Sequence, residues 1–512
     1  MSKVLVIGID SLSPALLSEF EDDLPNFSKL RKLSPAVKLG SIFPPDTIPA
    51  WTSIYTGLNP AKHGLIYVQD VFGTQRQEIV SIDNSIFQGR TFWDYAGNSG
   101  KKICLVFPHM AYPPWPVNGV MIGRSTTEIH VPKAPKWAAK TEIQIYPHEA
   151  AAKHRIPPFV MTVFGNYPGR KRLGEYAKDL WKATSDEAEF GLRISRESDW
   201  DLYFMYFYLL DNIQHFFWRY HDESDPRYPG AGPYKDIIRD SYRLFDKIVG
   251  EFMNSNPEAT TVVLSDHGHG MRPPKTVNIN AFLQRKGFLV AKAKRRNPGV
   301  YLVGKLKARL LDFVHRHELD YWLLNLATSR VFASMSKKVY VSSGSVDMEK
   351  SVAFLSSFAG AKSYSHGGLE IAANNASGMS YEELRGLLIK ELSELREPST
   401  GDKLTAWVRR REELYSGPYL SRYPDIVFEL KEGYGAYWDV NSPLIGTAYE
   451  HNIAPGGHKK DAVFLISKLD GRTCARTDMT LMDIAPTIMD LLGLDTAAYP
   501  EFDGSSIMEK SS

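Results

Sequence analysis

Five short apolar runs, each bounded by turn residues, restrict the fold of this chain more than any other feature of its sequence. They are Val4–Ile9, 102–107, 202–210, 260–265 and 462–466. Nearly every position in them is hydrophobic, which is typical of strands that are covered on both faces, as in parallel sheets. Helical patterns alternate with these runs, as in doubly wound α/β folds. We therefore predict an α/β core with a mainly parallel sheet flanked by helices.

The hydrophobic pattern changes between residues 292 and 438. A basic helical segment, 292–317, is followed there by polar loops and an amphipathic helix at 381–395. The basic segment is typical of a solvated helix face packed through one apolar stripe, and contact with an anionic partner is the alternative. Strand-like sequence returns afterwards. We predict a catalytic core formed by 1–291 and 439–512, with 292–438 as an inserted cap subdomain.

Charge and cysteine content exclude several classes of protein. Sixty-one basic and fifty-nine acidic side chains give a net charge of +2, so no nucleic-acid partner is expected. Only two cysteines are present, which excludes a disulfide scaffold and a four-cysteine zinc site. The first residues lead directly into a strand without the features of a signal peptide, and no apolar run approaches the roughly 20 residues of a membrane-spanning helix. We expect a cytoplasmic protein without a transmembrane segment.

Metal-binding residue types follow almost every predicted core strand. In open α/β sheets, ligands bind beyond the carboxyl ends of the strands. The residues at these positions are Asp10, Asp211, Asp266 and His267. His215 follows four residues after Asp211, on the same face if the segment is helical, and His458 lies in the loop just before the run at 462–466. Singly, each aspartate is more often a cap or turn residue, and each histidine more often an ordinary core or surface group. Jointly, three carboxylates and three imidazoles suit zinc or manganese and are enough for two ions.

Five motifs in a fixed order make the interpretation more specific. They read IGIDS, PPDTIPAWTSIYTGLNPAKHG, LDNIQHFFW, SDHGHG and GGHKKD. In this order they resemble the alkaline phosphatase superfamily, specifically its type I phosphodiesterase/nucleotide pyrophosphatase branch and the phosphohydrolase/phosphomutase proteins related to it. The resemblance covers about 3–288 and 438–507. It implies an alkaline phosphatase-like core that hydrolyses a small phosphate ester or nucleotide-like substrate with two divalent ions, zinc by preference or manganese.

The resemblance also implies roles for individual residues. Thr47 falls where the family places its nucleophile, which would form a phosphothreonine intermediate. One ion would be held by Asp211, His215 and His458, and the other by Asp10, Asp266, His267 and the Thr47 oxygen. A threonine hydroxyl needs a metal ion or a base to become a good nucleophile, so the second ion has a clear purpose. His63, His269 and His451 lie near the motifs, and each either binds metal, supports a ligand or is an ordinary loop residue.

One departure from the family leaves the substrate open. The pyrophosphatases carry an asparagine shortly after the His-Gly of the middle motif, whereas this chain has LIYVQ at 65–69. The candidates to stabilise the oxyanion in its place are the backbone amide of Thr47, Gln69 and Arg124. We expect cleavage of phosphodiester or pyrophosphate bonds. The alternatives are a phosphomonoesterase, a phosphomutase, although mutase relatives use serine, or a non-catalytic binding protein, in which crowded carboxylates would repel one another.

Overall fold

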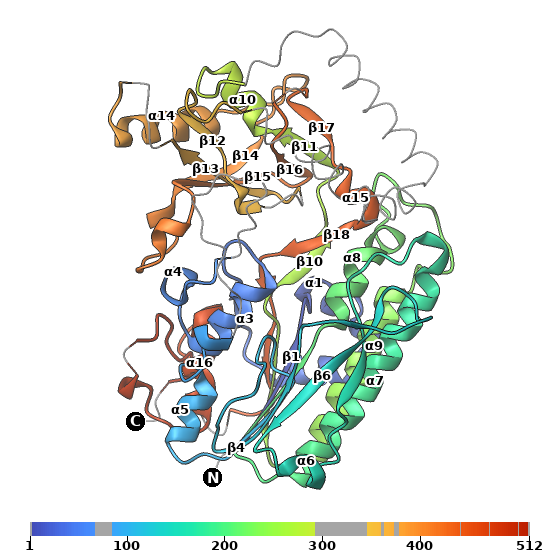
Figure 1. Cartoon of the computed structure of the whole chain (residues 1–512). Coiled ribbons are helices and arrows are strands. Elements are labelled where there is room, and N and C mark those ends of the chain that lie inside the picture. The colour runs from blue at the N-terminus through green and yellow to red at the C-terminus, as the bar shows by residue number, and fades with distance from the viewer. Residues whose placement is uncertain are drawn as a thin grey trace. The chain divides into compact units, whose positions relative to one another are not determined.

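The computed structural model describes residues 3–66, 84–291, 346–359, 363–372, 378–440, 442–469, 472–499 and 501–509. These residues form two compact units (Figure 1). The first contains 3–66, 84–270 and everything described from 456 onwards, and the second lies within 271–455. The predicted insertion, 292–438, falls in the second unit, and its basic segment lies outside the described residues. Within the described part of the chain, every helix is too short or too polar to span a bilayer.

A nine-stranded sheet forms the centre of the first unit. Its strand order is β20 (Phe464–Ile466), β9 (Thr260–Leu264), β1 (Val4–Ile9), β8 (Leu202–Phe207), β3 (Ile103–Val106), β4 (Gly119–Arg124), β6 (Ala138–Tyr146) and β5 (Ile129–His130), with β7 (Phe159–Val163) also paired to β6. The pairs β9–β1, β1–β8, β8–β3 and β3–β4 are parallel. Only the outer strands run antiparallel. The predicted α/β core with a mainly parallel sheet is confirmed.

All five predicted apolar runs contain strands of this sheet, but one run ends differently from the prediction. The run 202–210 forms β8 only as far as Phe207, and Leu209 and Leu210 begin helix α8 (Leu209–His221). Both leucines are buried. An apolar run cannot by itself distinguish a buried strand from a buried helix, which explains the difference. As a consequence, Asp211 and His215 lie one turn apart on α8.

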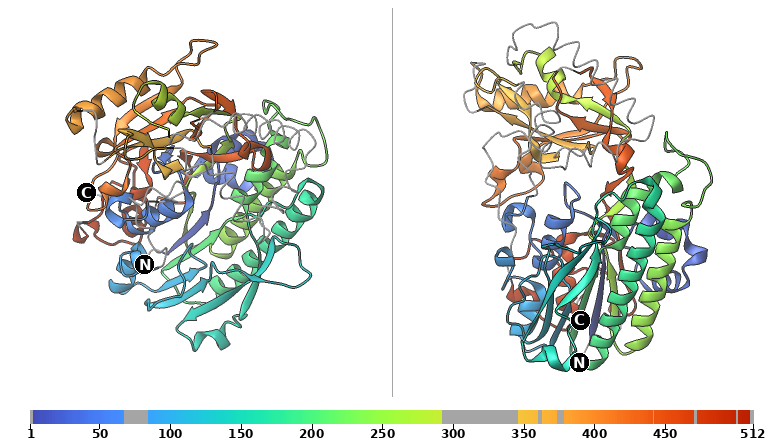
Figure 2. Two further views of the ribbon diagram at one scale, coloured as in Figure 1. Left: turned by 45° about the horizontal axis from the view of Figure 1, so that its top comes forward. Right: turned by 45° about the vertical axis from the view of Figure 1, so that its right-hand side comes forward.

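Helices cover both faces of the sheet, as Figure 2 shows. One group consists of α2 (Pro25–Leu33), α7 (Leu173–Glu197), α8 and α9 (Ile237–Ser255), which contact one another. The other consists of α3 (Thr47–Thr56), α5 (Phe92–Asn98) and α16 (Ile484–Leu491). Shorter helices are α1 (Pro14–Glu19), α4 (Pro60–His63) and α6 (Ala150–Lys153). The sheet is thus covered on both sides, which explains why its central strands are apolar throughout.

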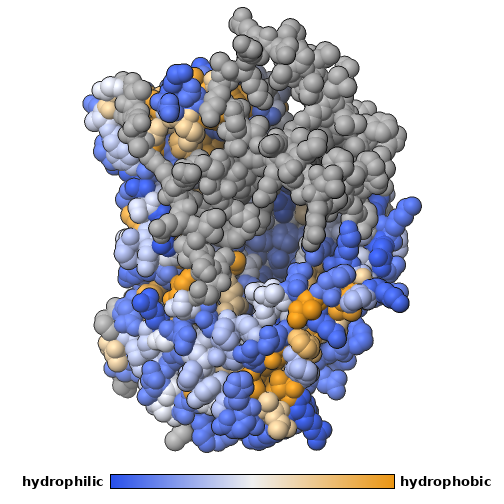
Figure 3. Space-filling view, viewed as in Figure 1, coloured by the Kyte–Doolittle hydropathy of each residue, from blue (hydrophilic) through white to orange (hydrophobic). Residues whose placement is uncertain are grey.

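The antiparallel strands β6 and β7 alternate between a buried and an exposed side. Thr141 and Thr162 are buried, whereas Lys140 and Met161, which pair across the two strands, face solvent. Successive side chains of a strand point to opposite faces, so this alternation is expected of a half-covered sheet. In Figure 3, apolar residues lie among polar ones over this part of the sheet. On the buried side of β6 and β7, Thr141 and Thr162 line a cavity of the first unit.

The second unit is built around two small sheets. One has the order β16 (Tyr434–Tyr437), β11 (Lys275–Asn278), β17 (Ile445–Thr447), and the other the order β12 (Ala353–Leu355), β13 (His366–Ile371), β15 (Ile426–Leu430), β14 (Thr405–Arg410). Its α-helices among the described residues are α10 (Ile279–Arg285), α14 (Tyr381–Ser393) and α15 (Glu450–Ile453). The predicted amphipathic helix is confirmed by α14, which buries Leu384, Leu388 and Leu392 at helical spacing.

Two further small sheets connect distant segments of the chain. β10 (Gly268–Met271) pairs with β18 (Gly456–Lys459). β2 (Lys38–Gly40) lies between β19 (Asp461–Ala462) and β21 (Asp478–Thr480). The pairing of β10 with β18 brings the segment that follows β9 next to the segment that carries His458.

Candidate active site

The structure brings together all seven residues that the sequence predicted for the site. Their positions follow from the topology, because β1, β8 and β9 are neighbours in the sheet and end at the same edge. Asp10 follows β1, Asp266 and His267 follow β9, Asp211 and His215 lie on α8, His458 lies in β18, and Thr47 is the first residue of α3. Residues up to 448 positions apart in the sequence (458 − 10) therefore contribute to one site.

Asp211, His215 and His458 form the first group of donors. The Nε2 atom of His458 lies 3.2 Å from Asp211 Oδ1, and that of His215 lies 3.3 Å from the same oxygen. The two Nε2 atoms are 3.1 Å apart. Ligands about 2.0 Å from a tetrahedral zinc ion lie about 3.3 Å from one another, so these three atoms are spaced as the ligands of one ion.

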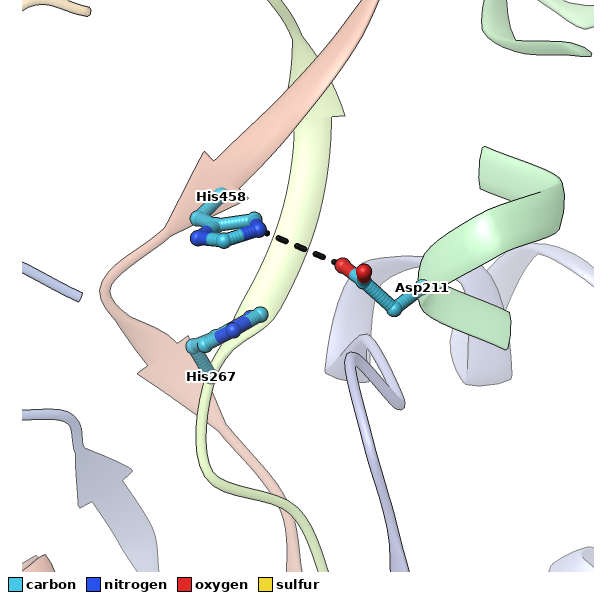
Figure 4. A group of neighbouring side chains, drawn as sticks. All are labelled: Asp211, His267 and His458. Carbon is cyan, nitrogen blue, oxygen red and sulfur yellow. Dashed lines mark ion pairs between the residues drawn. The ribbon is translucent and has the colours of Figure 1, made fainter. Parts of the chain in front are cut away.

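Asp10, Asp266, His267 and Thr47 form the second group. The Nε2 atom of His267 lies 3.3 Å from Asp266 Oδ2, 3.8 Å from Asp10 Oδ1 and 3.2 Å from Thr47 Oγ1. The ring of His267 also stacks on that of His458, with centroids 3.9 Å apart. Figure 4 shows His267 beside the facing pair Asp211 and His458. His267 is therefore the residue at which the two groups meet.

Backbone carbonyls fix the orientation of all three predicted histidine ligands. The Nδ1 atoms of His215, His458 and His267 lie 3.0, 2.9 and 3.1 Å from the carbonyl oxygens of Gly456, Pro45 and Gly268. A carbonyl only accepts a hydrogen bond, so each neutral ring carries its hydrogen on Nδ1 and leaves the lone pair on Nε2. Burial lowers the pKa of His267 well below its usual range, which favours the neutral ring.

A close backbone approach explains the glycine that accepts from His215. A Cβ atom on Gly456 would lie 2.1 Å from the carbonyl oxygen of Gln214, so a larger residue does not fit. Gly456 thus allows β18 to approach α8 closely enough for His458 and His215 to meet.

The chemistry of the carboxylates fits bound cations. Asp10 Oδ1 and Asp266 Oδ2 are buried and have no hydrogen-bond partner among the described residues. Burial, with the nearby charge of Asp211, raises the pKa of Asp266 to about 8. Burial and the charges of Asp266 and Asp211 raise the pKa of Asp10 well above its usual range. A divalent cation would satisfy the oxygens and remove this repulsion, so the donor set fits a metal ion.

Two residues that the sequence analysis did not assign to the site support its carboxylates. The Ser11 hydroxyl donates to Asp211 Oδ1 at 2.9 Å, and the Ser11 amide donates to Asp266 Oδ1 at 3.2 Å. The Tyr206 hydroxyl donates to Asp10 Oδ2 at 2.7 Å. The sequence could have indicated Ser11 as a site residue, because it directly follows Asp10. Tyr206 stands within an apolar run, where nothing in the sequence separates it from ordinary core aromatics.

The other three histidines near the motifs have different surroundings. His63 Nε2 lies 3.1 Å from the Ser53 hydroxyl, and its Nδ1 accepts from the Leu65 amide, so it stabilises the α3–α4 connection. His269 is buried beside the first group, with its ring centroid 4.6 Å from that of His215. His451 belongs to the second unit, where its Nδ1 lies 2.8 Å from the Arg272 carbonyl oxygen. Of the three, His269 alone adjoins the predicted ligands among the described residues.

A cavity of about 310 Å³ adjoins Asp10 and Thr47. Its walls come from the loop after β3, the end of β4, the buried side of β6 and β7, and the start of α8. In the loop, Phe107 and Met110 have φ angles of 54° and 60°, which are strained for residues other than glycine. Arg124, a predicted oxyanion candidate, lines the cavity, whereas Gln69 lies outside the described residues.

The type I phosphodiesterase/nucleotide pyrophosphatase family model matches residues 4–456. The chain belongs to this family. A phosphonoacetate hydrolase from Sinorhizobium meliloti 1021, solved in complex with phosphonoformate, has a similar structure, with a TM-score of 0.51 and 14% identity over 96% of this chain and 95% of that one. No curated protein matches. The predicted superfamily is confirmed, and family membership makes the chain a hydrolase that acts on phosphate esters.

Proposed function

We propose that this family member cleaves phosphodiester or pyrophosphate bonds, using two divalent metal ions and Thr47 as nucleophile. One observation carries the proposal. The Thr47 hydroxyl lies 3.2 Å from His267 Nε2, at the point where both donor groups and the cavity meet. A reacting phosphoryl group in the cavity would therefore be next to a hydroxyl and to six metal-type donors at once.

We assign one metal ion to each donor group, as the family resemblance implies. Asp211, His215 and His458 would hold one ion, and Asp10, Asp266, His267 and the Thr47 oxygen the other. Two bound ions supply a lowered pKa at the attacking hydroxyl and stabilisation of charge on the entering and leaving oxygens. The donors suit zinc, and manganese accepts the same oxygen and nitrogen ligands.

The position of Thr47 on α3 adds to its suitability as nucleophile. Thr47 is the first residue of a ten-residue helix. Amide groups in the first turn of a helix have no partner within the helix, and the helix dipole favours negative charge there. The backbone amide of Thr47 thus remains a candidate to stabilise the phosphoryl oxygens, and covalent transfer to Thr47 would give the phosphothreonine intermediate.

The alternatives predicted from the sequence are less well supported. A monoesterase needs a cation for the additional charge of its substrate, but Arg124 is paired with Glu187. The same argument applies to a phosphomutase acting on monoesters. A non-catalytic protein would keep Asp10 and Asp266 buried together without a cation, which their raised pKa values show to be unfavourable.

The experiment compares kcat/KM for bis-p-nitrophenyl phosphate and p-nitrophenyl phosphate in protein loaded with zinc and, separately, with manganese. We expect the diester to be preferred. Thr47→Ala should reduce kcat by at least about a thousand-fold, as loss of a nucleophile does, with metal content measured in parallel. Thr47→Ser is the matched control, because it keeps a hydroxyl and should retain part of the activity. Undiminished turnover by Thr47→Ala would contradict the role of Thr47, and a monoester preference would contradict the reaction class.

A further inference from the structure

Arg124, the cationic residue of the cavity wall, is paired with the carboxylate of Glu187. Arg124 Nη1 donates to Glu187 Oε1, and the two side chains are 12% and 2% exposed. The guanidinium packs on two aromatic rings, 5.0 Å from the centroid of Phe107 and 4.9 Å from that of Tyr208. Two aromatic faces and a buried carboxylate hold Arg124 in place. Arg124 lines the cavity, and its pairing with Glu187 leaves almost no net positive charge at this part of the wall.

The remaining wall offers hydroxyl groups and a further carboxylate instead of a second cation. Five of the lining residues carry a hydroxyl group, and a sixth carries a carboxyl group. They are Ser125, Thr126, Thr141, Thr162 and Tyr208, and Glu128. His109 also lines it, and burial lowers the pKa of that imidazole to about 4, so the ring is neutral at physiological pH. Among the described lining residues, Arg124 is therefore the one permanent cation.

We infer that the organic group attached to the phosphoryl centre of the substrate is uncharged and bears hydroxyls, and that Glu187 excludes anionic groups by neutralising Arg124. This inference rests on the proposed function and narrows it to phosphodiesters. It names the class of ester that the same site accepts, and the second phosphate of a pyrophosphate is one of the anionic groups that Glu187 would exclude. Its basis is the buried Arg124–Glu187 pair beside a wall of hydroxyls and one further carboxylate.

The physical reason is that hydroxyl groups match this wall and anions do not. A hydroxyl both donates and accepts, so it can bond to the wall hydroxyls, to the N–H groups of Arg124 and to Glu128. A carboxylate or second phosphate would need an unpaired cation after losing its water. Here it would meet a guanidinium shared with Glu187 and the charge of Glu128, which disfavours it.

The test uses two diesters with the same leaving group. These are the 4-nitrophenyl diesters of glycerol 3-phosphate and of 3-phosphoglycerate, which differ only in a hydroxymethyl group against a carboxylate. We expect kcat/KM of the metal-loaded protein to be at least about ten-fold higher for the glycerol diester, since tenfold corresponds to a modest electrostatic penalty. Equal values, or a preference for the carboxylate, would overturn the inference.

Glu187→Gln tests the role of the pair itself. The amide oxygen can still accept from Arg124 at nearly the same volume, but the guanidinium charge is no longer compensated. The preference should therefore move toward the carboxylate diester by about ten-fold. The matched control is Glu189→Gln, an exposed glutamate on the same helix that does not line the cavity. An unchanged preference in Glu187→Gln would overturn the inference.

Binding without turnover separates this inference from the proposed function. Calorimetry on metal-loaded Thr47→Ala protein should give tighter binding of glycerol 3-phosphate than of 3-phosphoglycerate, and Glu187→Gln in the same background should reduce the difference. If diesters are hydrolysed without the expected preference, the inference fails and the function stands. If no diester is hydrolysed but the binding preference is present, the reaction class fails and the inference stands. If neither diester hydrolysis nor the binding preference is observed, the proposed function and the inference are both contradicted.

Discussion

The two donor groups of the site contrast in their electrostatics although they share one edge of the sheet. Asp211 is 20% exposed at its side chain and has His215 and His458 beside it. Burial acts to raise its pKa, but the two imidazoles outweigh burial and hold the pKa of Asp211 well below its usual range. Asp10 and Asp266 are fully buried next to each other, and their pKa values are raised.

Because of this difference, the two groups need a cation to different degrees. In the first group two imidazoles balance one carboxylate, so the folded protein does not need a metal ion to keep that carboxylate ionised. The second is a pair of carboxylates that either hold protons or require a cation. We expect the second group to dominate how metal binding and pH affect stability, while both groups are needed for turnover.

The largest expected effect is common to both groups. Asp211→Asn and Asp266→Asn should each reduce kcat/KM for bis-p-nitrophenyl phosphate by at least about a thousand-fold, because each removes a charged ligand from a site that needs two ions. The assay is steady-state hydrolysis with zinc or manganese. Asp478→Asn, an exposed residue outside the site, is the control. If one of the two site variants keeps most of its activity, one group is not needed for catalysis.

A smaller effect should come from Ser11, which contacts both groups. Ser11→Gly removes the hydroxyl that donates to Asp211 but keeps the amide that donates to Asp266, and it tolerates the φ of 62°. We expect zinc affinity at the Asp211 group to fall by about 10- to 100-fold, as for other residues that orient a metal ligand. Competition with a chromophoric chelator measures this. Equal weakening at both groups would mean that Ser11 acts through the backbone and not through its hydroxyl.

The smallest effect concerns the pH dependence of stability in metal-free protein. The folded protein holds the Asp266 proton up to a pKa of about 8, whereas the unfolded chain releases it near 3.8, so the contribution of Asp266 to stability is lost as pH rises from about 4 to 8. The lowered pKa of Asp211 acts oppositely, and its stabilisation is lost only as pH falls below about 4.

Denaturant unfolding at several pH values tests this prediction. In Asp266→Asn, the free energy of unfolding should fall less steeply above pH 4. Asp211→Asn should lower the free energy of unfolding at neutral pH by about 1–3 kcal/mol, because it removes the carboxylate whose charge His215 and His458 stabilise. If both variants raise, or both lower, the free energy of unfolding at neutral pH, the two groups do not differ electrostatically as we describe.

The sequence could predict the parts of this molecule that depend on local pattern. Continuous apolar runs predicted the central strands, and aspartates directly after β1 and β9 predicted site residues. The boundary between β8 and α8 was missed because Leu209 and Leu210 are apolar in either structure. The cytoplasmic location and the identity of the metal stay predictions.

Side-chain partnerships across the fold were not predictable. Tyr206 donates to Asp10 across neighbouring strands, and Arg124 bonds to Glu187 across the sheet and α7. Neither partner has a fixed spacing in the sequence, so the local pattern contains no signal for them. These contacts depend on the packing of distant elements, and the structure is needed to find them.

Metal stoichiometry is the decisive measurement, because the proposed mechanism needs one ion in each group. After loading with zinc and removal of the excess, elemental analysis of the wild-type protein should give two ions per chain. Asp211→Asn and Asp266→Asn should each give one. A wild-type protein that holds a single ion, or variants that keep both ions, would contradict the assignment of the two donor groups.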